Sequence, residues 1–389
     1  MKMKTLALCV GAALLACGFS AQARSVTGVQ TCALLLYGAV ATGLYYQKAE
    51  GVDQATVAMA QYKQTPTDSH FGLKGREDLG NGWYVGFQVE SGWSLDSGSL
   101  FAENTLFNRV ARLYMGNETV EVSAGRMSTF TCASEPYSVF RKLRANMTGS
   151  GLPGMAPALM VYNAGELENV VAFATTAKEG FFLQGLYSNG SNKTESTYDW
   201  SDRNHVGQMA FGWTGGQLRV GSVLSWELPD QTAKDVVRKK ATKGIHLVGS
   251  YDFGPAAVSA IFYKGWNDWR IGGAPDMAQI LKTGSGVNNM NVTSEGMDTT
   301  VGFVSVGMPK GAHYFSAGLG LVDARWKGVS TGMTETKGMA TLASVMYYYN
   351  LSKRTQLYTG ASYSNGTDLL DGVDRFNQVF GTFGIVQRF

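Results

Sequence analysis

The feature that most limits the possible folds is a repeated unit of two short stretches with alternating polarity. Each stretch has about ten residues, a short turn joins the two, and a longer polar loop separates one unit from the next. Alternation with a period of two is typical of β-strands with one apolar face, and a tight turn between two such strands indicates a hairpin. The predicted hairpins are 70–79 with 83–92, 108–115 with 120–126, 170–176 with 181–187, 205–213 with 217–226, 244–252 with 256–263, 300–308 with 313–322, and 340–349 with 356–363.

Two further alternating stretches, 35–46 and 379–389, have no hairpin partner next to them in the sequence. Pairing them with each other gives an antiparallel sheet of 16 strands and closes it, so that no strand edge stays exposed. The last stretch ends on Phe389 without a polar tail, and Phe383 and Ile385 share a face with this phenylalanine. We therefore expect an all-β barrel whose last strand pairs with its first, with Phe389 at an interface.

The composition and the placement of aromatic residues favour a barrel in a membrane. Charged residues make up 16% of the chain, below the roughly 25% of ordinary soluble domains. No apolar run of about 20 residues follows the first 20 residues, which excludes a bundle of apolar membrane helices. Aromatic side chains gather at the ends of predicted strands, as in the interfacial girdles of transmembrane barrels, whereas a soluble sandwich would place them at strand centres. They are Tyr45, Tyr46, Trp93, Tyr187, Trp200, Trp226, Trp266, Trp269, Tyr347, Tyr348, Tyr349 and Tyr363.

Residues 1–23 have the pattern of a signal peptide. Lys2 and Lys4 form a positive start, an apolar stretch follows at 6–16, and Ala21-Gln22-Ala23 supplies a small-x-small cleavage site. We therefore expect the chain to be exported and cleaved after this site.

Cleavage would leave a barrel domain of residues 24–389, with a net charge of +1 instead of +3 because two lysines are removed. So small a charge gives no bulk attraction for nucleic acid. Cys32 and Cys132 would then enter an oxidising compartment, and the sequence leaves open whether they form a disulfide or stay isolated thiols. A lipid on Cys17 is the alternative to cleavage, because the residues before this cysteine resemble a lipoprotein processing box.

No motif indicates an enzyme, a metal site or a cofactor. The four histidines are scattered, and the sequence has neither a Gly-x-Ser-x-Gly elbow nor a phosphate-binding glycine loop. An outer-membrane barrel protease or lipase would assemble its acids, histidine and serine on distant loops, with His205 and His313 as the candidates here. That enzyme class and a secreted β adhesin are the alternatives to the interpretation that follows. We expect no enzymatic activity and no bound metal or cofactor.

Several runs in fixed order resemble Gram-negative outer-membrane general porins of the beta-proteobacterial type. FGLKGREDLGNGWYVGFQVESGWSLDSGSL at 71–100 is similar to the second and third strands of these porins, and LFNRVARLYMGNETVEVSAGR at 106–126 is similar to their next hairpin. LYGAV at 36–40 resembles their first strand, and the final Arg-Phe resembles their ending. In the rest of the chain only the rhythm of the hairpins matches.

The resemblance implies a homotrimer of 16-stranded transmembrane β-barrels in the outer membrane. Each barrel would have short periplasmic turns, long extracellular loops and a third loop that folds into the lumen. Such a pore lets ions and small hydrophilic solutes diffuse passively, and the charges of its lining bias which ions enter. The expected partners are therefore outer-membrane lipid, ions and small hydrophilic solutes, and not nucleic acid.

The pore constriction is predicted to combine cations on the wall with acid on the third loop. Lys74 stands where the family has an arginine, and Arg109 and Arg126 match arginines of its fourth and fifth strands. Strand alternation places Lys74, Arg76 and Glu90 opposite the apolar residues of their strands, which predicts that they face the lumen. The alternative for Arg76 and Glu90 is an ion pair with each other on the wall.

The third loop begins after Arg126 and is about as long as a constriction loop in this family. Its one acid before residue 154 is Glu135, which we expect at the constriction unless it is merely a solvated loop charge. Three cations follow it in the loop: Arg141, Lys142 and Arg144. The sequence therefore leaves the ion preference of the pore open.

Overall fold

The structure is a computed structural model. It describes residues 33–61, 64–132, 136–146, 165–189, 204–228, 240–268, 295–327, 335–371 and 376–389, all within one compact unit, Cys32–Phe389. The predicted signal peptide and Cys32 lie outside these residues. The domain bounds at residue 23 therefore stay a prediction, and it stays open whether Cys32 forms a disulfide with the buried Cys132.

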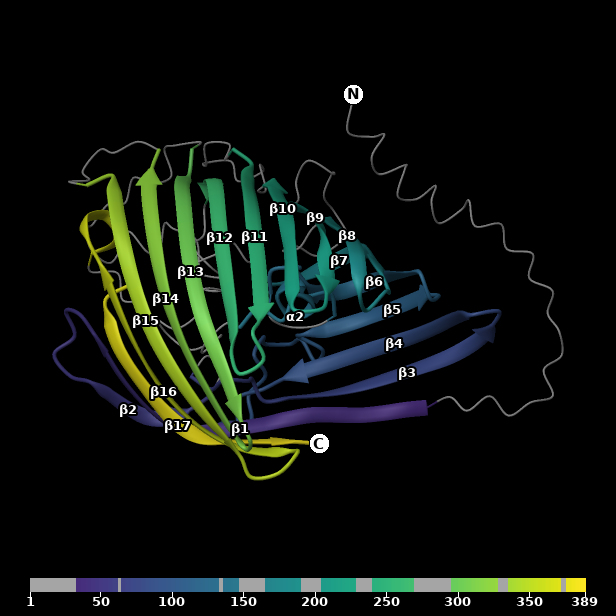
Figure 1. Ribbon diagram of the computed structural model, residues 1–389, viewed down its shortest axis with the longest axis horizontal. Coiled ribbons are helices and arrows are strands. Elements are labelled where there is room, and N and C mark those ends of the chain that lie inside the picture. The colour runs from purple at the N-terminus through teal and green to yellow at the C-terminus, as the bar shows by residue number, and fades with distance from the viewer. Residues whose placement is uncertain are drawn as a thin grey trace. The chain divides into compact units, whose positions relative to one another are not determined.

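One antiparallel sheet takes in every strand of the described chain (Figure 1). The strands are β1 (Ala33–Ala49), β2 (Thr56–Ala60), β3 (His70–Gly80), β4 (Trp83–Gly92), β5 (Val110–Gly116), β6 (Val120–Ser128), β7 (Glu166–Thr175), β8 (Gly180–Asn189), β9 (His205–Gly215), β10 (Leu218–Leu228), β11 (Thr242–Asp252), β12 (Ala257–Asp268), β13 (Met297–Lys310), β14 (His313–Trp326), β15 (Lys337–Asn350), β16 (Thr355–Gly366) and β17 (Gln378–Arg388). Two short helical segments accompany them, α2 (Val139–Lys142) and the 3-10 turn η3 (Asp368–Leu370). Within the described ranges no helix is long and apolar enough to cross a membrane.

The sheet closes into a barrel, as predicted. From β3 to β17 each strand pairs with the next one along the chain, and β1 pairs with both β3 and β17. The described residues form 17 strands, but β2 and β3 both pair with β1 along the edge opposite β17, so they are two parts of one interrupted strand. The closed ring therefore has the expected 16 strands.

The seam between β1 and β17 is a long ladder that runs from Ala39 opposite Arg388 to Ala49 opposite Gln378. Phe389 extends it by one step, because its N–H donates to the Gly38 carbonyl at 3.1 Å and its carbonyl oxygen accepts from the Gly38 N–H at 3.3 Å. The expected pairing of the last strand with the first is confirmed.

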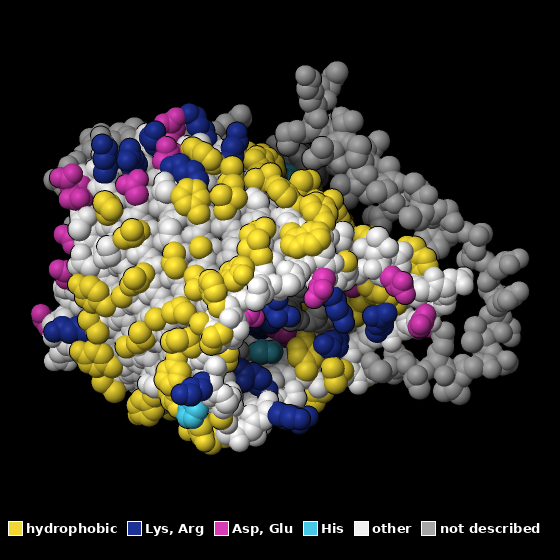
Figure 2. Space-filling model, viewed as in Figure 1, with side chains coloured by type: hydrophobic (Ala, Val, Ile, Leu, Met, Phe, Trp, Pro, Cys, Tyr) yellow, Lys and Arg dark blue, Asp and Glu magenta, His cyan; other side chains and the backbone are white. Residues whose placement is uncertain are grey.

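The outward face of the barrel is apolar along the strands, as Figure 2 shows for the face over β11 to β15. Among the predicted girdle residues, Tyr46 and Tyr363 are exposed on this outer face, whereas Tyr45 points inward and stacks on Phe380. Trp200 and Trp269 lie outside the described residues. Large apolar side chains exposed on the outer face include Phe181, Trp213, Leu319, Leu321, Val345 and Phe383. An apolar exterior of this kind suits the hydrocarbon region of a membrane.

The two sides of the inner wall differ, which alternation alone did not predict. From β7 to β15 apolar inward residues form one buried cluster with residues of the third loop, and buried polar side chains such as Gln208, His246 and Ser259 lie among them. The loop contributes Phe130, Phe140 and Leu143, and the wall contributes among others Phe182, Val223, Val248, Ile261, Phe303 and Val322. The inward faces of β3 to β6 carry polar and charged side chains instead, so the open part of the lumen lies against these strands.

The third loop folds into the barrel and crosses it, as the resemblance implied. The Phe130 N–H donates to the side chain of Gln208 on β9 at 2.7 Å. Further along the loop, the Asn146 N–H donates to the hydroxyl of Ser259 on β12 at 2.8 Å, and the Asn146 carbonyl accepts from Ser305 on β13. Hydrogen bonds to successive strands therefore hold the loop against the far wall and leave the β3 to β6 side open.

Candidate functional site

The polar side of the lumen begins on β3, where two cations project from the wall. Lys74 lies opposite Gln88 of β4, and Arg76 lies opposite Gly86. The alternate positions of these strands are apolar and face outward, as Phe87 does with 38% of its surface exposed. Lys74 and Arg76 therefore face the lumen, as strand alternation predicted.

Tyrosine rings lie beneath both cations. A Cβ atom on Gly72 would stand 2.5 Å from the ring of Tyr37, so glycine at this position allows the ring to lie flat against the wall. The Lys74 ammonium is 5.0 Å from the centroid of the Tyr37 ring. The guanidinium carbon of Arg76 is 3.6 Å from the centroid of the Tyr84 ring. Cation–π contacts of this kind position a charged side chain without neutralising it.

Neither Lys74 nor Arg76 forms an ion pair with any described residue, and both side chains are exposed. The electrostatic field of a cation without a carboxylate partner is not cancelled by a neighbouring charge. It acts on ions in the lumen within about one Debye length, about 10 Å at 0.1 M salt. Lys74 and Arg76 are therefore wall cations on the open side of the lumen that have no carboxylate partner among the described residues.

Glu90 and Arg109, also predicted at the constriction, are instead paired with each other. The Arg109 guanidinium contacts Glu90 at 2.5 Å and Asp68 at 2.8 Å, and Tyr37 donates a hydrogen bond to Glu90 at 2.9 Å. Burial acts to lower the pKa of Arg109, but the carboxylates of Asp68 and Glu90 outweigh it and raise this pKa above its usual value. Glu90 thus pairs with Arg109 and not with Arg76, and this group is compensated internally.

Arg112 on β5 connects the wall to the third loop, and sequence reasoning did not single it out. Its guanidinium donates to Glu121 at 2.9 Å and to the hydroxyl of Tyr137 at 3.1 Å. Tyr137 belongs to the third loop and donates in turn to Glu121 at 2.7 Å. Strand alternation could have found Arg112, since its neighbour Leu113 is an apolar residue that faces outward with 62% of its surface exposed.

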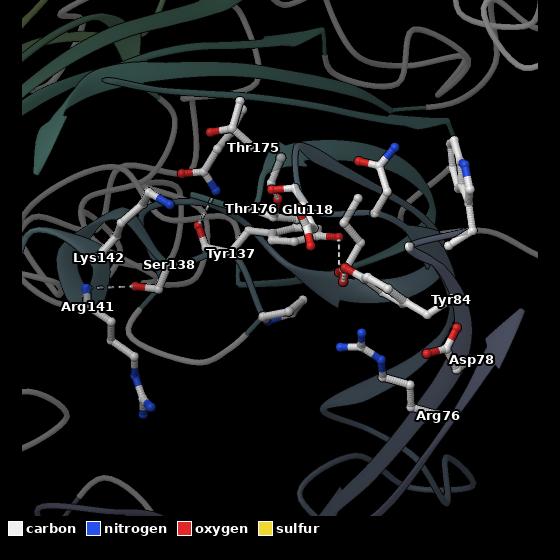
Figure 3. A pocket seen from close by; sticks show the side chains of 17 residues that line it. Arg76, Asp78, Tyr84, Glu118, Tyr137, Ser138, Arg141, Lys142, Thr175 and Thr176 are labelled. Carbon is white, nitrogen blue, oxygen red and sulfur yellow. Dashed lines mark hydrogen bonds between the residues drawn. The ribbon is translucent and has the colours of Figure 1, made fainter. Parts of the chain in front are cut away.

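The described part of the third loop brings cations to the opposite side of the open lumen. The hydroxyl of Ser138 accepts a hydrogen bond from the Arg141 N–H at the start of α2, and Arg141 and Lys142 occupy its last turn. Burial lowers the pKa of the half-buried Lys142 below its usual value. Figure 3 shows Arg141 and Lys142 on one side of the cavity and Arg76 on the other.

A cavity of 850 Å³ lies between this loop and the wall. Its charged lining consists of the cations Arg76, Arg141 and Lys142 and the acids Asp78, Glu118 and Glu121. Glu121 already binds Arg112, while Asp78 and Glu118 lie next to the short turns at the end of the barrel. The cavity is therefore the water-accessible space in which charges from the wall and from the loop act on the same solute.

Arg126 and Glu135, two of the predicted constriction residues, are not among the described residues that line this cavity. Arg126 lies opposite Ala111, whereas Gly125 lies opposite Arg112. Because Arg112 faces the lumen, the register corrects the assignment of Arg126 to the outer face, where it binds Glu168 at 2.9 Å. Glu135 falls outside the described residues, so its role stays a prediction.

The two histidines considered for an enzyme lie at opposite ends of the barrel. His205 begins β9 after a long loop and contacts the Tyr187 hydroxyl at 2.9 Å, while His313 begins β14 after a short turn. Among the residues that the structure describes, no group of three or more His, Cys, Asp or Glu side chains could hold a metal ion.

Comparisons with known proteins agree with this architecture. The profile of the family described as Gram-negative porin matches residues 7–369. An outer membrane porin protein of Bordetella pertussis is 26% identical over 385 residues, which cover 93% of this chain and 95% of that protein. Among solved structures, the anion-selective porin from Comamonas acidovorans has a TM-score of 0.62 at 20% identity, covering 92% of this chain and 99% of the other. A trimer form of OmpT from Vibrio cholerae has a TM-score of 0.58 at 14% identity, covering 92% and 99%.

Proposed function

The chain belongs to the Gram-negative porin family, and we propose that the pore it forms favours anions over cations. It is an outer-membrane β-barrel through which small solutes diffuse passively. The family alone leaves the sign of the selectivity open, because that sign depends on the charges of the individual lining.

One observation carries the proposal: cations face the open lumen from both sides, and the two on the wall have no carboxylate partner among the described residues. Lys74 and Arg76 project from the wall without an ion pair among the described residues. The described loop segment 136–146 carries Arg141, Lys142 and Arg144 and no acid. This loop is thus basic over its described part, whereas the constriction was expected to set wall cations against loop acid.

Two of the acidic side chains in the same region already form ion pairs with arginines of the wall. Glu90 binds Arg109, and Glu121 binds Arg112. Asp78 and Glu118 remain on the lining at the turn end of the cavity. An anion that enters from the loop end therefore meets a net attraction before it reaches them.

The described relatives are consistent with this preference and with a trimer. The Comamonas acidovorans protein is named an anion-selective porin, and we propose the same preference here on the basis of this chain's own charges. OmpT of Vibrio cholerae has a trimer form, and we propose a homotrimer for this protein as well. We also propose that residues 1–23 are removed on export.

The test is the zero-current potential of single pores in a planar bilayer across a potassium chloride gradient. We expect the zero-current potential to have the sign of a pore that is more permeable to chloride than to potassium. The double substitution Lys74→Glu with Arg76→Glu should move the potential toward that of a cation-selective pore. Arg126→Glu is the matched control, because the register places Arg126 on the outer face. A cation-selective wild type, or an equal shift in the control, would contradict the proposal.

A further inference from the structure

Three tyrosines on the open side of the lumen are paired with glycines of the neighbouring strands. The direct partners in the registers are Tyr37 with Gly72, Tyr84 with Gly116, and Tyr114 with Gly86. A Cβ atom on Gly86 would stand 2.5 Å from the ring of Tyr114, and one on Gly116 would stand 2.8 Å from the Tyr84 hydroxyl oxygen. A larger side chain at these positions would therefore push the tyrosines away from the sheet. Glycine lets the rings lie across the inner wall, as aromatic residues do over glycine in other sheets.

Each of these rings carries a cation, and the three cations differ. The guanidinium of Arg112 is bound to Glu121 at 2.9 Å, so its charge is compensated. Lys74 ends in a compact ammonium, which offers no flat surface. Arg76 is planar, lies 3.6 Å from the centroid of the Tyr84 ring and forms no ion pair with any described residue. Of the three, Arg76 therefore combines a flat cationic surface with the lack of a carboxylate partner in the described chain.

The Tyr84 ring covers one face of the Arg76 guanidinium, and the side chain of Arg76 is exposed toward the 850 Å³ cavity between the wall and the third loop. Figure 3 shows this guanidinium directed from the wall toward the side of the cavity where Arg141 lies. A guanidinium group is weakly hydrated and stacks on aromatic rings. An aromatic ring of a solute can therefore stack on the second face, so that Arg76 lies between this ring and Tyr84.

The opposite side of the same cavity offers partners for a carboxylate. Arg141 and Lys142 of the third loop line it, and a carboxylate accepts charge-assisted hydrogen bonds from guanidinium and ammonium groups. Asp78 and Glu118 line the cavity next to the short turns, where they would repel a second negative charge. The volume falls in the range of about 300–1,000 Å³ that is usual for small-molecule sites. The cavity thus fits a planar ring that carries one carboxylate.

We propose that the lumen contains a binding site for aromatic monocarboxylates, with the ring of the solute stacked on Arg76 and its carboxylate at Arg141 and Lys142. The inference rests on the proposed function, since the cations that favour anions also bind the carboxylate. It adds a preference for flat rings, which a field of positive charge does not supply, because such a field acts on the charge of a solute and not on its shape. A solute bound at this site obstructs the path and interrupts the current carried by other ions.

Block of the single-pore current in a planar bilayer tests the preference for a ring. Benzoate and cyclohexanecarboxylate are the probes, because they have the same charge and nearly the same size, and only benzoate is flat and aromatic. In potassium chloride, we expect benzoate to halve the mean current at a roughly tenfold lower concentration than cyclohexanecarboxylate, which is the effect of one desolvated cation–π contact. Block by neither acid, or equal block by both, would overturn the proposal.

Substitutions separate the flat surface from the charge. Arg76→Lys keeps the positive charge but removes the planar group, so the ratio of the two blocking concentrations should fall severalfold. Arg126→Lys is the matched control, because it makes the same chemical change on the outer face, and its ratio should equal that of the wild type. Arg141→Gln with Lys142→Gln should weaken block by both acids alike, since it removes only partners of the carboxylate. An unchanged ratio in Arg76→Lys, or an equal fall in Arg126→Lys, would overturn the proposal.

The zero-current potential in a potassium chloride gradient, measured on the same pores without either acid, distinguishes this site from the proposed ion preference. An anion-selective wild type that both acids block equally would overturn the site and leave the ion preference standing. A cation-selective wild type in which block by benzoate still depends on Arg76 would overturn the ion preference and support the site.

Discussion

The main-chain groups of Phe389 and Gly38 hydrogen-bond to each other in both directions, which adds a last step to the ladder between β17 and β1. The ring of Phe389 lies over Gly38, so a Cβ atom on this glycine would stand 2.6 Å from the ring and 2.4 Å from the carbonyl oxygen of His70 on β3. At Gly38 the first, second and last strands of the ring thus pack closely against one another.

Substitution of Gly38 by alanine should destabilise the barrel. The new methyl group would overlap a backbone atom of β3, and overpacking of this kind costs about 1–3 kcal/mol. Urea unfolding of the purified protein in lipid vesicles, followed by tryptophan fluorescence, measures the loss. Gly302→Ala is the matched control in another strand, because a methyl group there meets nothing within 4 Å. An equal effect of both substitutions would contradict the steric explanation.

Removal of the Tyr137 hydroxyl should loosen the third loop. Tyr137→Phe deletes the hydrogen bonds to Glu121 and Arg112, and each lost bond to a charged group is worth about 1.5–3 kcal/mol. We expect more frequent closures and greater current noise in single-pore recordings. Tyr114→Phe is the control, because its hydroxyl has no hydrogen bond among the described residues. Quiet currents in Tyr137→Phe would show that other contacts hold the loop.

The proposed anion preference should weaken at alkaline pH earlier than an ordinary lysine would allow. Burial lowers the pKa of Lys142, so this cation loses its charge at a lower pH than a solvated lysine, whose pKa is about 10.4. The zero-current potential measured in steps from about pH 7 to about pH 10 reports the change. Lys142→Arg should remove the early part of the shift, since arginine stays charged over this range. A profile that is identical in both proteins would exclude Lys142 from the ion path.

Intact mass of the protein purified from outer membranes tests the predicted processing. We expect a polypeptide that begins at Arg24. A mass that corresponds to a chain acylated on Cys17 would instead establish the lipoprotein alternative. The same spectrum, compared before and after reduction and alkylation, shows whether Cys32 and Cys132 form a disulfide.

Most of the strand order could be predicted because alternation is a local signal. The hairpin at 70–79 and 83–92 agrees with β3 and β4 to within one residue. The predicted ends of the strands were less accurate next to the long loops. For example, β12 continues to Asp268, beyond its predicted end at residue 263. The separate strand β2 was not predicted, since its five residues are too few to show a clear alternation. β2 pairs with β1, as β3 does.

The site was only partly predictable for a different reason. Alternation placed Lys74 and Arg76 in the lumen, and in β5 and β6 the same period of two distinguishes the inward Arg112 from the outward Arg126, which the resemblance suggested for the constriction. The pairing of Glu90 could not be predicted, because Arg109, which binds Asp68 as well, reaches it from a loop position that has no period.

The amino-acid order determined the strand period, the apolar exterior and the closure of the sheet. The first two depend on neighbours two residues apart, and closure follows because the first and last strands are left without a hairpin partner. The tertiary structure decided which side of the lumen stays open. That outcome depends on contacts between distant residues, such as Asn146 with Ser259 and Ser305, which bury one half of the inner wall beneath the third loop. Contacts over such separations depend on the shape of the closed barrel, and no local pattern records them.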